Sequence, residues 1–298
     1  MRHISVLLKE TIDGLGLKEG DIIVDGTLGG GGHTLEIIKR FSSKVKIIGF
    51  DLDIDAINRV KDLTKDKGAD IVLVNNGFEE IDREIKRLNI DKINRLILDL
   101  GFSSFQLEES GRGFSFLKNE PLLMTLKKDL TDEDLTAKEI VNDWAEESLA
   151  DIIYGFGEEK YARKIAKAIV LARQDKKIET TFDLVSILEK VVGRFYKGRK
   201  IHFATKTFQA LRIATNRELE NLEKVLDRGF QNLSLGGRIA VITFHSLEDR
   251  LVKRKFRDLV QQGQAKLINK KPIIPKETEE KENPRSRSAK LRLIEKII

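Results

Sequence analysis

The sequence contains no cysteine, and this absence excludes disulfide bonds, cysteine-ligated zinc sites and a cysteine nucleophile. A chain without cysteine fits a reducing compartment. The sequence also lacks an apolar run long enough to span a membrane, and the residues 1–6 carry no signal-peptide core. No internal repeat is visible. We therefore expect a cytoplasmic protein with no membrane partner and no bound metal.

What is present begins with a short apolar strand and a glycine-rich turn. Ile22–Val24 are three β-branched residues, which favour a parallel strand covered on both faces. Asp25 follows, and five glycines stand within the seven positions Gly26–Gly32. Glycine lets the backbone adopt positive φ and approach a ligand closely. The helix predicted from Thr34 directs free N–H groups at the turn, so the stretch predicts a nucleotide-like cofactor there.

The same turn lacks the two common phosphate-binding patterns. Its glycines give G-x-G-x-x-G in no register. In a P-loop starting at Gly26, lysine and serine or threonine would stand where Gly32 and His33 are found. An acid and glycines without a phosphate-binding cation suit a cofactor that places an amino acid group near the turn, as S-adenosylmethionine (SAM) does. The alternative is a glycine-rich surface turn without a ligand.

A second acid favours the cofactor. Asp51 follows the predicted strand Val45–Phe50, about one βαβ unit after Asp25, where a ribose-binding carboxylate belongs in such folds. Asp51, Asp53 and Asp55 also open a helical stretch, so a helix cap is the competing interpretation. We expect Asp51 to bind the ribose, and Asp53 or Asp55 to cap the helix.

Two further strands predict a doubly wound parallel sheet of the α/β class. They lie at Asp70–Val74 and Arg95–Gly101. Because ligands of such sheets lie at the carboxyl ends of the strands, Asp51, Phe78 and Asp99 are expected near the glycine turn. Phe78 would stack on an adenine there, or else pack in the core under the next helix.

The alternation of strands and helices stops near Glu108, and helical periodicity follows. We expect a discontinuous domain formed by residues 1–107 and 217–298, with an all-helical insert at 108–216. One long helix is predicted from the apolar stripe Phe208–Leu226. A strand returns at Arg238–His245, and the last apolar run, Leu291–Ile298, is expected to form an antiparallel edge strand.

Charge is distributed unevenly along the chain. The whole chain carries +6, but residues 1–159 carry −11, residues 160–220 carry +9 and residues 238–298 carry +8. This contrast favours a nucleic acid docked on a basic face, although solvated helix faces explain most single lysines. Ile201–Arg212 also mixes cations, aromatic rings and hydroxyls, as RNA contacts would. The residues expected to hold the RNA backbone are Arg163, Lys206, Arg212, Arg285 and Arg287.

Asp99 is the first candidate for catalysis. A neutral exocyclic amine is a poor nucleophile, because its lone pair is delocalised into the base. It needs an acceptor for an N–H and alignment with the methyl group. Enzymes that methylate such amines often carry an acid, asparagine or serine, then two prolines and an aromatic residue. Asp99–Phe102 matches the acid and the aromatic residue but not the prolines, so Asp99 could instead contact the amino group of SAM.

Two other residues are candidates for the same chemistry. Ser103 would help Asp99 to orient the amine. His245 ends a strand at the same sheet edge and would carry a proton or orient a donor, although a lone histidine more often only satisfies a hydrogen bond.

Taken together, these motifs resemble the RsmH (MraW) family of SAM-dependent methyltransferases over nearly the whole chain. The motifs that carry the resemblance are His3–Leu8, Asp25–His33, Asp99–Leu107, Arg112–Phe116, His202–Arg212, Phe244–Arg250 and Asn283–Arg292. The resemblance implies a Rossmann-like SAM-dependent methyltransferase sheet with a helical insert. It also implies methylation of N4 of a cytidine in the decoding region of 16S rRNA, in the bacterial small ribosomal subunit. Carried over residue by residue, the cofactor contacts fall on Gly31, Gly32, His33, Asp51, Phe78, Asp99 and Gln106.

The chain departs from the family pattern after Pro121. The family usually reads Leu-Asp-Met-Arg-Met there, whereas Leu122–Leu126 has neither the acid nor the arginine. This departure motivates an alternative function, a catalytically impaired rRNA-binding ribosome assembly factor that retains the fold. A small-molecule methyltransferase is a third interpretation, and the basic second half of the chain argues against it.

Overall fold

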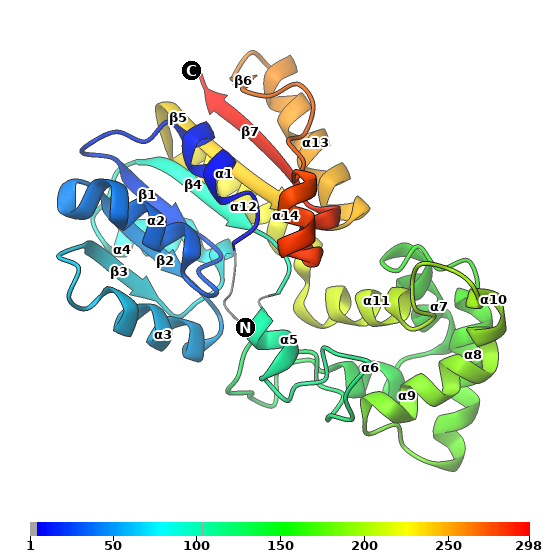
Figure 1. The fold of residues 1–298 in the computed structure, drawn as a ribbon. Coiled ribbons are helices and arrows are strands. Elements are labelled where there is room, and N and C mark those ends of the chain that lie inside the picture. The colour runs from blue at the N-terminus through cyan, green and yellow to red at the C-terminus, as the bar shows by residue number, and fades with distance from the viewer. Residues whose placement is uncertain (1–4, 103) are drawn as a thin grey trace. The chain divides into compact units, whose positions relative to one another are not determined.

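The computed structural model describes residues 5–102 and 104–298. The chain forms two compact units (Figure 1). The sheet unit comprises Met1–Gly101 and Leu219–Ile298, and the helical unit comprises Phe102–Glu218. No helix in the described ranges combines the length and the apolar character needed to cross a bilayer.

The sheet unit contains a seven-stranded sheet in the order β3-β2-β1-β4-β5-β7-β6. The strands are β1 (Ile22–Asp25), β2 (Lys46–Phe50), β3 (Asp70–Val74), β4 (Ile93–Asp99), β5 (Leu233–Thr243), β6 (Ala265–Leu267) and β7 (Lys290–Lys296). The first five pair in parallel, whereas β7 runs antiparallel to β5 and to β6. This sheet confirms the α/β, Rossmann-like fold class expected from the sequence.

Helices cover both faces of this sheet (Figure 1). Alternate residues of the strands point to opposite faces, so Ile23 and Ile97 contribute to one core cluster while Val24 and Leu96 contribute to another. The apolar stripes of α1 and α2 bury the first cluster, and those of α4, α12 and α13 bury the second. The helices are α1 (Leu8–Leu15), α2 (Gly32–Phe41), α3 (Ile54–Thr64), α4 (Ile81–Arg87), α12 (Glu218–Asn232), α13 (Ser246–Gln261) and α14 (Glu277–Glu282), with short 3₁₀ turns at Ser42–Lys44, Phe78–Glu80 and Pro284–Ser288.

The helical unit has a hydrophobic core of its own, built from the inner faces of its helices. Capping boxes at Thr136 and Thr180 fix the starts of α6 and α9, since each threonine accepts from the backbone N–H of the third helical residue. The helices are α5 (Ser104–Glu108), α6 (Ala137–Asp143), α7 (Glu146–Gly155), α8 (Ala162–Asp175), α9 (Thr181–Leu188), α10 (Arg194–Tyr196) and α11 (Thr205–Asn216), with a π-helical turn at Glu189–Gly193.

Two sequence predictions about these elements are wrong. The stripe Phe208–Leu226 does not form one helix, because Arg217 adopts a left-handed conformation with φ 50° and separates α11 from α12. The last strand is antiparallel as expected but not at the edge, because β6 pairs along its outer side. Ala265–Leu267 is too short to show a strand pattern in the sequence.

Candidate cofactor and catalytic site

The glycine-rich turn connects β1 directly to α2. Gly29 and Gly31 adopt positive φ of 49° and 79°, which glycine tolerates without steric cost. A β-carbon on Gly31 would lie 2.7 Å from a methyl carbon of Val60, and one on Gly32 would overlap the Ser5 side chain. The positive φ of Gly31, and the close packing of Gly31 on Val60 and of Gly32 on Ser5, therefore favour glycine at these positions.

Asp25 anchors the base of the turn. Its carboxylate is buried, accepts the hydroxyl proton of Thr34 at 2.7 Å and accepts from the backbone N–H of Thr27 at 3.2 Å. Burial raises the pKa of Asp25 above its ordinary value, and the two hydrogen bonds oppose that rise. Asp25 thus fixes the turn from within the protein.

Asp51 follows β2 and contacts the same turn. Its Oδ2 accepts from the backbone N–H of Gly29 at 2.8 Å, and its Oδ1 accepts from that of Asp53 at 2.9 Å. Burial raises the pKa of Asp51 to about 6, and the negative charges of Asp53 and Asp25 act in the same direction. Asp53 caps α3 by accepting from the N–H of Asp55, which confirms one of the two expected capping assignments.

Asp99 ends β4, and Thr27 links it to the turn. The backbone N–H of Asp99 donates to Thr27 Oγ1 at 2.6 Å. Asp99 Oδ2 lies 3.8 Å from His33 Nδ1, and Oδ1 has no hydrogen-bond partner among the residues that the structure describes. Burial raises the pKa of Asp99 well above its ordinary value, and the charges of Asp25 and Glu248 raise it further.

Phe78 also lies at this edge. It begins a 3₁₀ turn after β3 and packs partly against the sheet core. A β-carbon on Gly26 would lie 3.2 Å from the Phe78 β-carbon, so the base of the Phe78 side chain lies beside the first glycine of the turn. The sheet unit therefore brings together six of the predicted cofactor residues, namely Gly31, Gly32, His33, Asp51, Phe78 and Asp99.

These residues fit SAM. The turn offers the partly exposed backbone of Gly29, Gly30 and Gly32. Asp51 offers a carboxylate for the ribose diol, and Asp99 Oδ1 offers a carboxylate oxygen without a partner in the described ranges. A buried carboxylate oxygen that lacks a partner is costly unless a ligand donates to it. No cation that would serve a triphosphate stands at this turn, as the sequence indicated.

The remaining cofactor and catalytic predictions fall in other places. Gln106 is buried on α5 of the helical unit, and its contact with SAM stays a prediction. Ser103 lies outside the described residues. His245 is the N-cap of α13, where its Nδ1 accepts from the N–H of Glu248 and its Nε2 lies 3.1 Å from Glu248 Oε1. Capping accounts for the position of His245, and its catalytic role stays a prediction.

The predicted RNA-binding residues have different surroundings. Arg163 and Arg287 are exposed. Lys206 donates to the backbone carbonyl of Glu158. Arg212 binds both carboxylate oxygens of Glu218, at 2.7 and 2.8 Å. Arg285 is exposed on the Pro284–Ser288 turn. A bidentate carboxylate already satisfies Arg212, so it is less available to a phosphate than the sequence indicated.

Thr27 and Thr34 are site residues that the sequence reasoning missed. Thr27 Oγ1 connects the turn to Asp99, and Thr34 Oγ1 donates to Asp25. The signal was present in the D-G-T spacing that opens the turn, where a hydroxyl stands two residues after an acid.

Known proteins are similar to this chain over nearly its whole length. The MraW methylase family model matches residues 1–297. Two proteins named ribosomal RNA small subunit methyltransferase H, from Clostridium botulinum strains Kyoto / Type A2 and 657 / Type Ba4, are 46% and 45% identical, over 99% of this chain and 99% of each relative.

Solved structures of low sequence identity are also similar to the chain. An rRNA methylase from Streptococcus thermophilus is 12% identical with a TM-score of 0.48, covering 99% of both chains. A putative rRNA methylase from Clostridium thermocellum is 14% identical with a TM-score of 0.49, covering 99% of this chain and 98% of that one.

The match along nearly the whole chain confirms the resemblance stated from the sequence motifs, and with it the SAM cofactor. The protein belongs to the MraW methylase family of SAM-dependent methyltransferases.

Proposed function

We propose that the protein transfers a methyl group from SAM to N4 of a cytidine in the decoding region of bacterial 16S rRNA. The names of the curated relatives support an rRNA of the small subunit as the substrate. The observation that carries the proposed chemistry is the Asp99 carboxylate, which ends β4 with Oδ1 unpartnered among the described residues and with a raised pKa. Such an oxygen is suited to accept an N–H from an amine.

The cofactor would be held by the strand ends of the sheet unit. Asp51 would accept the hydroxyl protons of the ribose, because it is the carboxylate that follows β2 and already contacts the turn. Phe78 would lie against the adenine. The backbone of Gly31 and Gly32 would pass close to the methionine part, with His33 at the start of α2 beside it.

When bound, SAM supplies an electrophilic methyl group carried on a positively charged sulfur. Asp99 would accept an N–H of the cytidine amine and so hold its nitrogen in line with the methyl group. A raised pKa makes Asp99 a stronger proton acceptor than an ordinary carboxylate, so the proton that N4 loses can pass to Asp99 or to water. Ser103 is the second residue proposed to orient the amine.

The cytidine would have to leave its stacked position in the rRNA to reach Asp99. The helical unit would bind the RNA backbone through Arg163, Lys206 and Arg212. The Pro284–Ser288 turn of the sheet unit would bind it through Arg285 and Arg287. These contacts would place the substrate on the basic second half of the chain, whereas the cofactor would lie on the acidic first half.

The experiment that tests this function is methyl transfer from labelled SAM to three acceptors: small ribosomal subunits that lack the modification, free 16S rRNA and cytidine. Nuclease digestion and mass spectrometry then identify the product nucleoside. We expect N4-methylcytidine from the ribosomal acceptors only. A methyl group on another base or on the sugar would refute the proposed reaction, and efficient methylation of free cytidine would favour a small-molecule methyltransferase.

An rRNA-binding assembly factor without activity is the second candidate, and the loop Leu122–Leu126 motivates it. This loop is held firmly without the acid and the arginine usual in the family. Asn216 Nδ2 donates to the carbonyl of Met124 at 2.7 Å, and Arg112 Nη1 donates to that of Leu126 at 2.6 Å. SAM binding without transfer to any ribosomal acceptor would support this candidate, and Leu123 and Thr125 would then be the first positions to restore.

A further inference from the structure

A group of exposed cations in the helical unit takes no part in the site described above. The segment from Glu189 to Lys200 carries five cations and one acid. Lys160, just before α8, and Lys164, in the first turn of α8, are exposed as well. The "cation surface" is defined here as Lys160, Lys164, Lys190, Arg194, Lys197, Arg199 and Lys200.

The backbone that carries this surface is irregular. The π-helical turn Glu189–Gly193 leads from α9 into α10, and Gly198 then adopts a positive φ of 78°. π-Helical turns are rare and occur frequently at functional sites. Two residues after the segment, the ring of His202 stacks on the ring of Phe116 with centroids 4.6 Å apart. The backbone is therefore irregular over Glu189–Lys200, and the ring contact of His202 with Phe116 follows directly after it.

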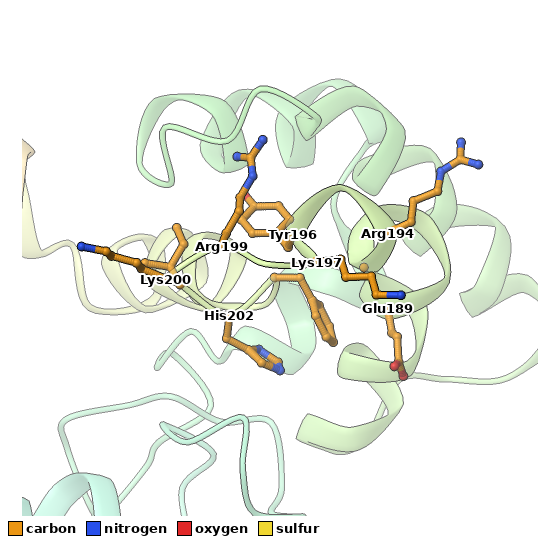
Figure 2. Close-up of a pocket in the computed structure, with 10 residues that line it drawn as sticks. Glu189, Arg194, Tyr196, Lys197, Arg199, Lys200 and His202 are labelled. Atoms are coloured by element: carbon orange, nitrogen blue, oxygen red, sulfur yellow. The ribbon is translucent and has the colours of Figure 1, made fainter.

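A pocket of about 550 Å³ lies under this segment and is lined by residues between Glu189 and Phe203. Figure 2 shows that the charged ends of Arg194, Arg199 and Lys200 point away from one another. A compact anion such as a free phosphate is bound by donors that converge on one point. Cations that diverge over a surface suit a polyanion whose charges are spread along a chain.

Aromatic rings hold several of these cations in place. The guanidinium carbon of Arg194 lies 4.7 Å from the Phe195 ring centre, and that of Arg199 lies 5.1 Å from the Tyr196 ring centre. The ammonium group of Lys160 lies 4.9 Å from the Tyr161 ring centre. A cation–π contact orients a cation and leaves its charge uncompensated, whereas an ion pair neutralises it.

In the part of the chain that the structure describes, no carboxylate neutralises the cation surface. Within residues 5–102 and 104–298, none of its seven cations forms an ion pair. Glu159 lies beneath them, but it is fully buried, and it accepts the hydroxyl proton of Tyr196 and the N–H of Tyr161. By contrast, Lys138 and Lys176 of the same unit pair with Glu179 and Asp183, at 2.7 and 3.2 Å.

We propose that the cation surface binds the sugar–phosphate backbone of the RNA substrate, with Lys197 and Lys200 each neutralising one phosphate. The identity of the RNA rests on the proposed function, whereas the binding itself rests on the charge and the geometry described here. The charge of +9 over residues 160–220 indicated a basic region, but the sequence did not single out these cations, because net charge along the chain does not reveal which cations are already paired.

The test compares two double variants that lose the same residue types from the same unit. Lys197→Gln/Lys200→Gln removes two uncompensated charges, and Lys138→Gln/Lys176→Gln removes two paired ones. Binding of labelled 16S rRNA is measured by filter retention between about 0.05 and 0.3 M KCl. The logarithm of the binding constant falls as the logarithm of the salt concentration rises, and each lost phosphate contact reduces the steepness of this fall by about 0.7 to 0.9. We expect Lys197→Gln/Lys200→Gln to lower the slope by about 1.4 to 1.8 and to weaken binding about 25- to 60-fold at 0.1 M salt.

The control is expected to keep the wild-type slope. SAM affinity and thermal unfolding, measured on both variants, show that neither has lost its fold. Equal slopes for the two double variants would overturn the proposal. Weaker binding to assembled subunits with an unchanged slope on free RNA would assign the surface to a protein partner and overturn it as well.

Failure of the proposed function is distinguishable from failure of this inference. If the wild-type protein methylates no cytidine but the slope difference appears, the RNA-binding surface stands and the reaction falls. If the wild-type protein makes N4-methylcytidine and the slopes are equal, only this inference fails.

Discussion

SAM affinity is expected to depend on pH through Asp51. Burial raises the pKa of this carboxyl to about 6 in the free protein. The ribose hydroxyls donate hydrogen bonds, so SAM binds the ionised carboxylate. The dissociation constant should therefore scale with one plus the ratio of protonated to ionised Asp51. This factor is about 1.1 at pH 7, about 2 at pH 6 and about 11 at pH 5.

Asp51→Asn removes the titration together with the charged acceptor. Hydrogen bonds to a charged group contribute about 1.5 to 3 kcal/mol, so the variant should bind SAM about 10- to 150-fold more weakly at pH 7. It should also show a flatter affinity profile at lower pH. The pKa of Asp99 is raised too, and its titration changes SAM affinity with pH equally in the wild type and in Asp51→Asn. The difference between the two affinity profiles therefore reports the titration of Asp51 alone.

Isothermal titration calorimetry with SAM between about pH 5 and 7 measures this difference, because the amino group of SAM stays protonated over that range. Asp53→Asn is the matched control. It changes the neighbouring acid, whose capping role asparagine can take over. It should keep the loss of affinity on acidification, moved to lower pH, because the charge of Asp53 is one of the causes that raise the pKa of Asp51. Parallel profiles for the wild type and Asp51→Asn would refute the assignment of the ribose to Asp51.

The raised pKa has an opposite consequence for the free protein. A carboxyl with a higher pKa in the folded state binds protons more readily when folded, so its stabilising contribution is present below about pH 4 and is lost as pH rises through about 6. The rise from 3.8 to about 6 corresponds to about 3 kcal/mol at neutral pH. Asp51→Asn should therefore raise the free energy of unfolding at pH 7, by up to that amount, while weakening SAM binding.

Three further predictions concern the same unit. Asp99→Asn should lower the rate of methyl transfer at saturating SAM at least 100-fold, since a positioned proton acceptor contributes about 10²- to 10⁴-fold, and an unchanged rate would exclude Asp99 from the chemistry. Gly31→Ala should destabilise the fold by about 1 to 3 kcal/mol more than Gly20→Ala in urea unfolding. Both glycines have positive φ, but among the described residues only Gly31 of the two has a neighbour within 4 Å of an added β-carbon. Equal decreases in the free energy of unfolding would contradict the role of this packing. Arg95→Met should lower the free energy of unfolding by about 3 to 5 kcal/mol, because it leaves the nearly buried carboxylate of Asp21, 3.1 Å from Arg95, without its cation. A decrease below about 1 kcal/mol would show that water replaces that partner.

The arrangement of the sheet was predictable because its signals are local. Apolar strands separated by helical patterns gave β1 to β4, and the acids after β2 and β4 fell at the carboxyl edge by the general rule for such sheets. The glycines of the turn predicted a close approach to a ligand, which stays a prediction. The structure shows a different reason for glycine at one of them, because Gly31 has a positive φ and lies against Val60.

What the sequence could not give depends on contacts between distant residues. Nothing in the residue type of Arg217 indicates a left-handed conformation, so the break between α11 and α12 went unseen. The pairing of Arg212 with Glu218 changes the availability of a cation that the sequence assigned to RNA. The cations of Glu189–Lys200 were not singled out from the sequence for the converse reason. Only the structure shows that, within the described residues, none of them forms an ion pair with a carboxylate.

A crystal structure with S-adenosylhomocysteine, the product of the cofactor, tests most directly whether the ends of β1, β2 and β4 form the methyl-transfer site. We predict both ribose hydroxyls within about 3.2 Å of the Asp51 carboxylate, the adenine against Phe78 and the sulfur on the side of Asp99. An adenosine bound at another edge of the sheet, or a ribose held by a different side chain, would contradict the account.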